Sequence, residues 1–223
     1  MSAANAAYQG GATRIELCSA MHVDGLTPTT NQIVAARQGF PKAGLIAMLR
    51  PGPGDFTYSD RDLFILLDRI PDLHRAGADG ISFGFLNDVD QIDLAATARL
   101  VAICGKLDMT TTFHRAFDAT PDTNTSLDSL IEAGVDRVLT SGTPWGTPGR
   151  AIDALDRLST TIDRAHNRIE VIIAGGVSAE TIPTILSGVP QADRFSLHAY
   201  SGTLVDGRPS LEAVQSLVDA ANA

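Results

Sequence analysis

The stretch Thr111–Asp118, "TTFHRAFD", begins like a buried β-strand and ends with a histidine, an arginine and an aspartate. Threonine and phenylalanine favour strands, whereas three ionisable or polar residues at one strand end need an explanation. A surface strand carries such residues by simple alternation. A strand in the middle of a parallel sheet is buried on both faces and carries them only where its end opens on a site. The rest of the chain decides between these two interpretations.

Short apolar or β-branched runs alternate with longer amphipathic runs along the whole chain. Strands are predicted over 13–19, 44–50, 80–86, 108–116, 137–142, 169–176 and 194–200. Helices are predicted over 58–77, 91–105, 125–134, 149–167, 178–188 and 210–222. Unbroken alternation of this kind predicts an α/β fold, a parallel sheet covered by helices. Repeats of roughly 30 residues favour the (β/α)₈ TIM barrel over a doubly wound sheet. No linker divides the chain, so 1–223 is expected to be a single domain.

The strand count departs from the regular barrel. Seven strands are predicted, and 223 residues are fewer than the roughly 250 that are typical of that fold. The segment 4–11, "ANAAYQGG", resembles the end of a helix followed by glycine. We therefore expect that the usual first strand is lacking in this chain. A late start codon, a truncated chain and an unusual barrel closure all remain open as reasons.

Composition restricts the classes of partner. The formal net charge is −9, with 17 Lys and Arg against 26 Asp and Glu, which disfavours nucleic acids and anionic membranes. The two cysteines, Cys18 and Cys104, have no CxxC spacing, and no secretory signal or membrane-length apolar run is found. A cytoplasmic protein is therefore expected, and its acidic composition does not exclude a small anionic ligand in a locally basic pocket.

Polar residues at the strand ends predict a site at the C-terminal mouth of the barrel. Because side chains alternate along a strand, Glu16, Arg50, His114 and His198 are expected to face the interior, together with Thr140. Glu16, His114 and His198 are the candidate acid–base residues, and Arg50 is the candidate anion clamp. Two alternatives stay open. Glu16 and Arg50 can form a buried ion pair that fills the barrel, and either histidine can be a satisfied core residue.

A glycine turn adds a candidate anion site. Gly175 and Gly176 lie between a predicted strand and the helix predicted over 178–188, where backbone N–H groups can cradle a phosphate. Ser201 and Gly202 follow the last strand and would complete this site. The glycines can instead serve close helix packing. The loop residues Asp55, Tyr58, Arg115, Asp118 and Trp145 are candidates for a lid, although Arg115 is also expected to turn away and pair with Asp118.

Several motifs resemble one known family. They are "RIELCSAMHVDGLTPT" (14–29), "LRPGPGDFTYSD" (49–60), "GFLNDVDQID" (84–93), "TFHRAFD" (112–118), "VLTSG" (138–142) and "IIAGGV" (172–177). In this order they resemble the CutC family of copper homeostasis proteins. The resemblance implies a cytoplasmic (β/α)₈ barrel that forms a homodimer or larger homo-oligomer, and a link to copper. The soft ligands that remain for Cu(I) are Cys18 and, just beyond it, Met21 or His22.

Three functions remain open from the sequence. The resemblance implies a protein that binds or handles copper without turnover, with Cys18 as the candidate metal ligand and Cu(I) as the candidate cofactor. The polar mouth favours an enzyme that performs acid–base chemistry on a small phosphorylated or carboxylated metabolite. A binding or scaffold barrel with a degenerate site is the third possibility. The sequence names neither a substrate nor a reaction, since a barrel fold does not supply one.

Overall fold

A computed structural model describes residues 1–223, and its centre is one seven-stranded parallel sheet. The strands are β1 (Ile15–Leu17), β2 (Leu45–Met48), β3 (Gly80–Phe83), β4 (Thr110–Phe113), β5 (Arg137–Thr140), β6 (Glu170–Ile173) and β7 (Phe195–Leu197). They pair in sequence order, each parallel to the next. The predicted α/β fold of the TIM-barrel type is therefore confirmed, with seven strands as expected.

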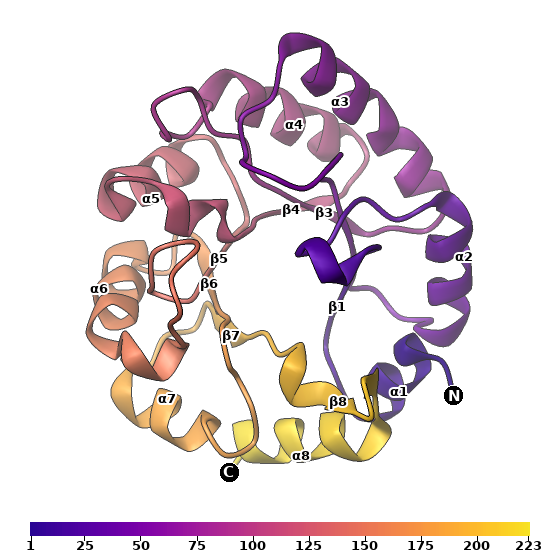
Figure 1. The fold of residues 1–223 in the computed structure, drawn as a ribbon, viewed down its shortest axis with the longest axis vertical. Coiled ribbons are helices and arrows are strands. Elements are labelled where there is room, and N and C mark those ends of the chain that lie inside the picture. Colours follow the sequence, from indigo (N-terminus) through magenta and orange to yellow (C-terminus); the bar gives the residue numbers. More distant parts are fainter.

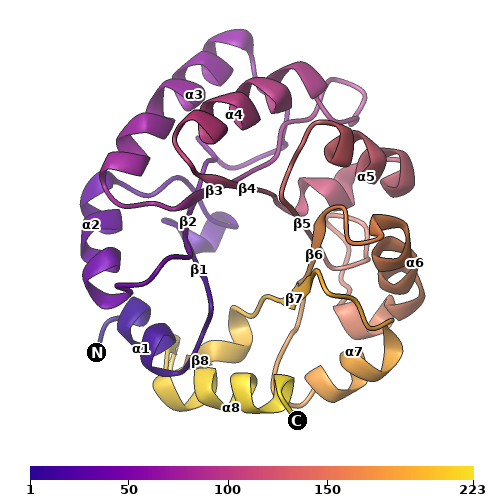
Figure 2. The ribbon, with the colours of Figure 1, turned by 180° about the vertical axis from the view of Figure 1, so that it is seen from behind.

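Helices surround the sheet on its outer side (Figures 1 and 2). They are α1 (Ala3–Gln9), α2 (Thr30–Gly39), α3 (Asp60–Arg75), α4 (Leu94–Lys106), α5 (Thr123–Glu132), α6 (Leu155–Ala165), α7 (Ile182–Gly188) and α8 (Leu211–Ala221). In α3, the Ser59 side chain caps the first turn, and leucine and isoleucine residues at helical spacing are buried between Leu63 and Leu73. No helix of the chain combines the length and the apolar character that a membrane crossing requires.

The two faces of each strand have different roles. On β2, Leu45 and Ala47 join a cluster of 40 buried residues, which packs largely between the sheet and the helices. Ile46 and Met48 lie on the opposite face, inside the curled sheet. Arg50 continues the inward series just beyond the end of the strand. This alternation brings the inward side chains of neighbouring strands together at the C-terminal end of the sheet.

The sheet is not a closed cylinder, because β1 and β7 are its two edges and do not pair with each other. On the outside, α8 contacts both α7 and α1 and so covers this seam (Figure 2). On the inside, Arg14 reaches across it. Arg14 Nη1 donates to Glu170 Oε2 at 2.9 Å, and its Nη2 donates to Ser196 Oγ at 2.8 Å. The seam is thus bridged by side chains rather than by strand pairing.

Three helices differ from the sequence-based expectation, and one of them, predicted over 149–167, spans only Leu155–Ala165. Helix α2 was not predicted, although Thr29 and Gln32 form a capping box at its start. The helix predicted over 178–188 begins only at Ile182, and the residues before it form a turn. Short 3-10 helices lie at Met21–Val23 (η1), Arg115–Ala119 (η2), Ala151–Asp153 (η3) and Ser201–Thr203 (η4), and a small hairpin joins β8 (Leu204–Val205) to β9 (Arg208–Pro209).

Candidate functional site

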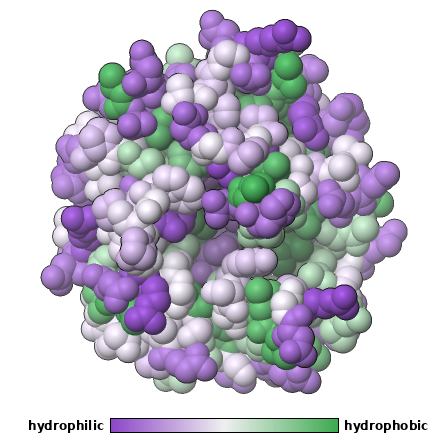
Figure 3. Space-filling view, in the orientation of Figure 1, coloured by the Kyte–Doolittle hydropathy of each residue, from purple (hydrophilic) through white to green (hydrophobic).

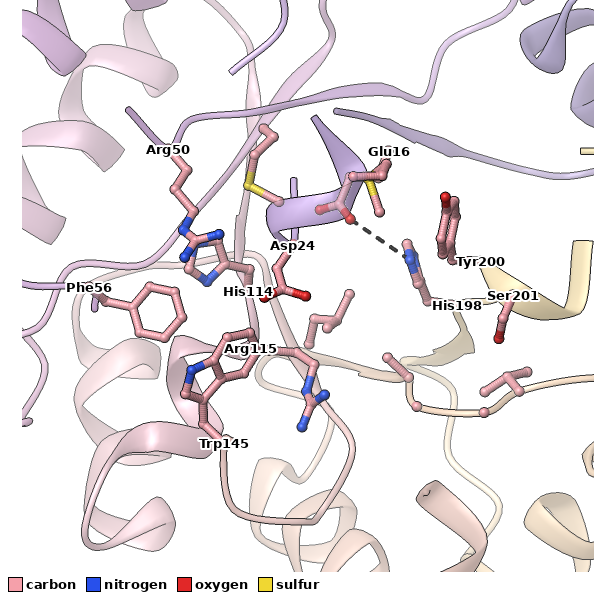
Figure 4. A pocket seen from close by; sticks show the side chains of 17 residues that line it. Glu16, Asp24, Arg50, Phe56, His114, Arg115, Trp145, His198, Tyr200 and Ser201 are labelled. Carbon is pink, nitrogen blue, oxygen red and sulfur yellow. Dashed lines mark ion pairs between the residues drawn. The ribbon is translucent and has the colours of Figure 1, made fainter. Parts of the chain in front are cut away.

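A cavity of about 270 Å³ lies at the C-terminal ends of the strands. Figure 3 shows this face hollowed near its centre, and Figure 4 shows the side chains that line the cavity. Nine of the predicted site residues line it, namely Glu16, Arg50, His114, Arg115, Trp145, Gly175, Gly176, His198 and Ser201. They come from strand ends and loops that are far apart in the sequence. The fold therefore brings acidic, imidazole and guanidinium groups to one common opening.

Arg50 provides a buried positive charge that no carboxylate neutralises. Its side chain is 3% exposed, and no acidic group lies within ion-pair distance of it. Nη1 donates to the carbonyl oxygen of Val23 at 2.9 Å, and Nη2 donates to that of Gly54 at 2.9 Å. The Nε atom makes no hydrogen bond of normal geometry, and the buried Tyr58 hydroxyl, which also has no partner, lies close to this guanidinium group. A buried charge of this kind favours an anionic ligand, and the alternative of a Glu16–Arg50 ion pair is wrong.

His114 is held as a neutral imidazole. Burial lowers its pKa to about 3, with the positive charge of Arg50 as the second cause. The Nδ1 atom accepts a hydrogen bond from the backbone N–H of Ala116 at 3.1 Å, so the neutral ring carries its proton on Nε2. Nε2 itself has no partner. This side chain can donate a hydrogen bond at neutral pH but does not suit the predicted acid–base role there.

Gly84 makes room for this imidazole. A Cβ atom at Gly84 would lie 2.3 Å from His114 Cε1 and 2.5 Å from the Cβ of Ala116. Such distances are too short for any side chain larger than hydrogen. The glycine thus fixes where the ring sits, because the ring packs directly on its backbone.

Glu16 and His198 form the acid–base pair of the cavity. Glu16 lies on β1 and His198 follows β7, so the pair spans the seam between the two sheet edges. His198 Nε2 lies 3.8 Å from Glu16 Oε2, and both side chains are partly accessible, at 30% and 16% exposure. Figure 4 shows the two groups pointing toward each other across the opening. A carboxylate and an imidazole this close can share or exchange a proton with a bound molecule.

The glycine turn after β6 lines the same cavity and carries unpaired backbone donors. Gly175 and Gly176 have φ values of +92° and +69°, which favour glycine. No acceptor within the chain takes the N–H groups of Gly175, Gly176 or Val177. Close packing also matters, since a Cβ at Gly175 would lie 2.8 Å from the Cβ of Ser141. Both sequence interpretations of these glycines are compatible with this geometry.

Ser201 lines the cavity next to this turn, whereas Gly202 lies just behind it. A Cβ at Gly202 would lie 2.4 Å from the carbonyl oxygen of Val177. Glycine at this position therefore lets η4 pack directly on the turn after β6. Gly202 shapes the candidate anion site without lining it.

Aromatic and cationic side chains build the opposite wall. The ring centroids of Phe56 and Trp145 are 5.1 Å apart, and the Arg115 guanidinium carbon lies 5.3 Å from the Trp145 ring centre. Arg115 Nε donates to Asp118 Oδ2 at 2.7 Å, so the expected pairing with Asp118 is present. Arg115 nevertheless lines the cavity (Figure 4). The same guanidinium group contacts both the Asp118 carboxylate and the Trp145 ring.

Three predicted lid residues do not reach this cavity. Asp118 is buried and accepts hydrogen bonds from Arg115, from the Thr140 hydroxyl and from the Ser141 N–H, so it is a structural anchor. Tyr58 packs edge-on against Phe85, and burial raises its pKa to about 12. Asp55 lines a neighbouring hollow beyond Phe56 and Trp145.

Sequence reasoning missed part of the lining. The missed residues are Asp24, Met48, Phe56, Leu139, Ala174, Val177 and Tyr200, and Met21 was considered only as a possible copper ligand. Met48 shares the parity of Arg50 and could have been found by alternation along β2. On β5 the parity was assigned wrongly, since Leu139 and not Thr140 lines the cavity. Met21 begins η1 and Asp24 follows it, and no strand pattern predicts the position of this loop element.

The donor set does not fit a copper centre. Cys18 is the predicted ligand, but it does not line the cavity. Burial, together with the nearby Glu16 carboxylate, raises the pKa of its thiol and opposes the thiolate that Cu(I) prefers. The sulfur atoms of Met21 and Cys18 lie on the same side of Gly25. No group of three or more His, Cys, Asp or Glu side chains is placed to hold a metal ion.

Fold and cavity together define a protein of the TIM-barrel type with its site at the C-terminal mouth. The CutC family pattern matches residues 1–195, and the chain belongs to the CutC family. It is 38% identical over 187 residues to copper homeostasis protein cutC homologs of Mus musculus and Homo sapiens, covering 84% of this chain but 66% of each relative. The matches thus span just under two thirds of those proteins. The structure of CutC from Streptococcus agalactiae superposes with a TM-score of 0.73 at 30% identity, covering 82% of this chain and 87% of that one.

Proposed function

We propose that this chain is an enzyme that transfers protons on a small phosphorylated metabolite. One observation carries the proposal. Gly175, Gly176 and Val177, whose N–H groups have no acceptor within the chain, line the same cavity as the Glu16–His198 pair. A volume of about 270 Å³ is at the small end of ligand pockets, which suits a metabolite of a few carbon atoms.

Binding would begin at the glycine turn. Backbone N–H groups after a parallel strand bind phosphate well, and in barrels of this type the last two strand–helix loops commonly form the phosphate site. Here these loops are the turn after β6 and the segment with Ser201 after β7. The guanidinium groups of Arg50 and Arg115 add positive charge to the cavity of a chain whose formal net charge is −9. An anion is thus attracted locally although the whole chain repels it.

Proton transfer would follow at the other end of the ligand. The Glu16 carboxylate can accept a proton, and the His198 imidazole 3.8 Å away can hold or return it. The neutral His114 can donate a hydrogen bond to the ligand without competing for the proton. A carboxylated metabolite would use the same positive groups, so the carboxylate is a second acceptable anion for this site.

The test is thermal stabilisation by phosphorylated compounds, with variants of Gly176. Ligand at 100 times its Kd stabilises by about 2.7 kcal/mol, which for a chain of this size raises Tm by roughly 5–10 °C. Gly176→Asp places a negative charge in the turn and is expected to abolish the shift. Gly176→Asn introduces a side chain of the same shape as aspartate, with the same backbone strain but no charge. We expect this variant to keep a measurable rise in Tm with the ligand. The nearest side chain, Arg150, is half-exposed and can yield to either substitution.

Two results would contradict the proposal. One is a panel of inorganic phosphate and small sugar phosphates that never raises the Tm of the unmodified protein. The other is stoichiometric Cu(I) binding that Cys18→Ser abolishes. That result would favour the copper function that the names of the relatives state.

A further inference from the structure

Two buried hydrogen-bond donors at the cavity wall have no partner. They are Arg50 Nε and His114 Nε2, and both side chains are at least 95% buried. Leaving a buried donor unsatisfied costs roughly 1–3 kcal/mol, so such donors are rare without a use. The remaining polar atoms of these side chains are already occupied, by loop carbonyls for Arg50 and by the N–H of Ala116 for His114. The two free donors are therefore held in fixed directions.

Phe56 connects the two donors in space. Its ring centre lies 5.1 Å from that of His114 and 5.3 Å from the guanidinium carbon of Arg50. The two side chains thus lie against the same face of the cavity, as Figure 4 also shows. Together they carry one positive charge, because Arg50 is charged and His114 is neutral. One positive charge and two free donors on the same wall match a single negatively charged oxygen.

We propose that Arg50 Nε–H and His114 Nε2–H form an oxyanion pocket, and that the substrate is accordingly a phosphorylated aldehyde or ketone that is enolised in the cavity. The inference rests on the proposed function and specifies its substrate class. The carbonyl oxygen lies at Arg50 and His114, the phosphate lies at the turn Gly175–Val177, and the carbon between them faces Glu16. In Figure 4, Arg50 and His114 lie on one side of the opening and His198 and Ser201 on the other.

The chemical step needs no further reactant. Glu16 takes a proton from the carbon next to the carbonyl, and the C–H electron pair becomes the new carbon–carbon double bond. The carbonyl π pair moves to oxygen, where the two donors stabilise the enolate. Return of the proton from Glu16 or His198 to the same carbon re-forms the C–H bond, the enolate oxygen returns its electron pair to the carbonyl bond, and the result is an exchange of that hydrogen. A neutral imidazole is suited to this position, because it donates a hydrogen bond without protonating the oxygen fully.

Phe56 must shift for a ligand to reach the two donors. Both atoms are screened from water in the present arrangement, and Phe56 is the neighbour that they share. Phe56 also packs on Trp145, which is the single tryptophan of the chain. Binding of a ligand that occupies the oxyanion pocket is therefore expected to change the fluorescence of Trp145, whereas a ligand confined to the phosphate site leaves it nearly unchanged.

The experiment compares two probes by titration calorimetry and fluorescence. Ethyl phosphate carries only the phosphate, whereas 2-phosphoglycolate adds a carboxylate that mimics the enolate oxygens. The unmodified protein is expected to bind 2-phosphoglycolate ~10–100-fold more tightly, since hydrogen bonds to a charged group are strong. His114→Asn keeps an acceptor near the position of Nδ1 and removes the Nε2 donor, so the preference is lost. His114→Gln keeps a donor near the position of Nε2 and retains much of the preference.

Each outcome separates the two proposals. If neither probe binds, the proposed function itself fails. If ethyl phosphate binds but 2-phosphoglycolate gains nothing, or if the gain survives His114→Asn, the oxyanion pocket is refuted while the phosphate site stands. The ratio of the two affinities is also expected to stay constant from pH 5 to pH 8, because His114 is neutral throughout that range. A preference that rises steeply toward pH 5 would show that a protonated imidazole is required and would overturn the inference.

Discussion

Gly84 is the residue on which the position of His114 depends most directly. We expect Gly84→Ala to displace the imidazole and to destabilise the protein by about 1–3 kcal/mol, because its Cβ would lie 2.3 Å from His114 Cε1. Gly105→Ala is the matched control. Gly105 lies in α4 with no atom within 4 Å of its Cβ position, so alanine is expected to stabilise by about 0.5–1 kcal/mol. Denaturant unfolding of both variants measures the difference, and equal effects would refute this account of Gly84.

His114 also predicts a pH dependence of stability. Its pKa of about 3 in the folded state lies below its usual value of 6.5. As the pH falls, the unfolded chain therefore binds this proton at a higher pH than the folded chain does. The contribution of the neutral ring to the free energy of unfolding is fully present above pH 6.5 and is lost as the pH falls toward 3. The expected slope is at most ~1.4 kcal/mol per pH unit in that window. His114→Gln removes this titrating group, so the free energy of unfolding is expected to depend less steeply on pH between 6.5 and 3. An unchanged pH dependence would contradict the lowered pKa of His114.

Strand parity was sufficient to predict the strand-end residues of the site. Glu16, Arg50, His114 and His198 all line the cavity at the mouth, and alternation along the strands is the signal that pointed to them. It did not predict the partners. Glu16 pairs with His198 and not with Arg50, since the curl of the sheet brings β1 near β7 without joining them. The protonation state of His114 depends on its burial, which no local pattern reveals.

Among the elements, the two sheet edges depend on a side-chain bridge. Arg14 donates to Glu170 and Ser196, and Ser196 donates to Glu170. Burial alone would raise the pKa of Glu170, but the hydrogen bonds from Arg14 and Ser196 and the charge of Arg14 hold it below its usual 4.5. The bridge therefore stabilises the fold at neutral pH, and this contribution is lost as the pH falls below about 4.5.

Removing the bridge is expected to loosen the seam. Arg14→Ala leaves the Glu170 carboxylate unpaired at 15% exposure, so we expect a loss of about 1–3 kcal/mol at pH 7 and a smaller loss near pH 3. Arg75→Ala serves as the control, because Arg75 and Asp72 form an ion pair in which both side chains are more than half exposed. That change is expected to stay within about 0.5 kcal/mol. Equal losses in the two variants would show that the seam does not depend on Arg14.

The order of elements was predictable, but one helix was not. All seven strands were predicted because each is an apolar or β-branched run between glycine or polar turns. The helix α2 was missed since only Ile33, Ala36 and Gly39 of its ten residues are buried, which leaves a weak periodic pattern. The position of the loop that carries Met21 and Asp24 could not be predicted from the sequence, for a different reason. It lies over the mouth because Arg50 binds the carbonyl oxygen of Val23, a tertiary contact.

For the whole molecule, the sequence predicted the barrel-type fold and the family, and the structure and the comparisons confirm both. The homo-oligomer that the resemblance implies stays a prediction, which light scattering during size-exclusion chromatography can test. The central claim concerns the mouth, where groups from β1, β2, β4, β6 and β7 and from the loops that follow them share one cavity.

The location of bound phosphate tests that claim most directly. A crystal structure with inorganic phosphate is expected to show the anion at the turn after β6, with oxygen atoms about 2.7–3.2 Å from the nitrogen atoms of Gly175, Gly176 or Val177. Phosphate found only outside the cavity, or a cavity that stays without phosphate at saturating concentration, would contradict the account.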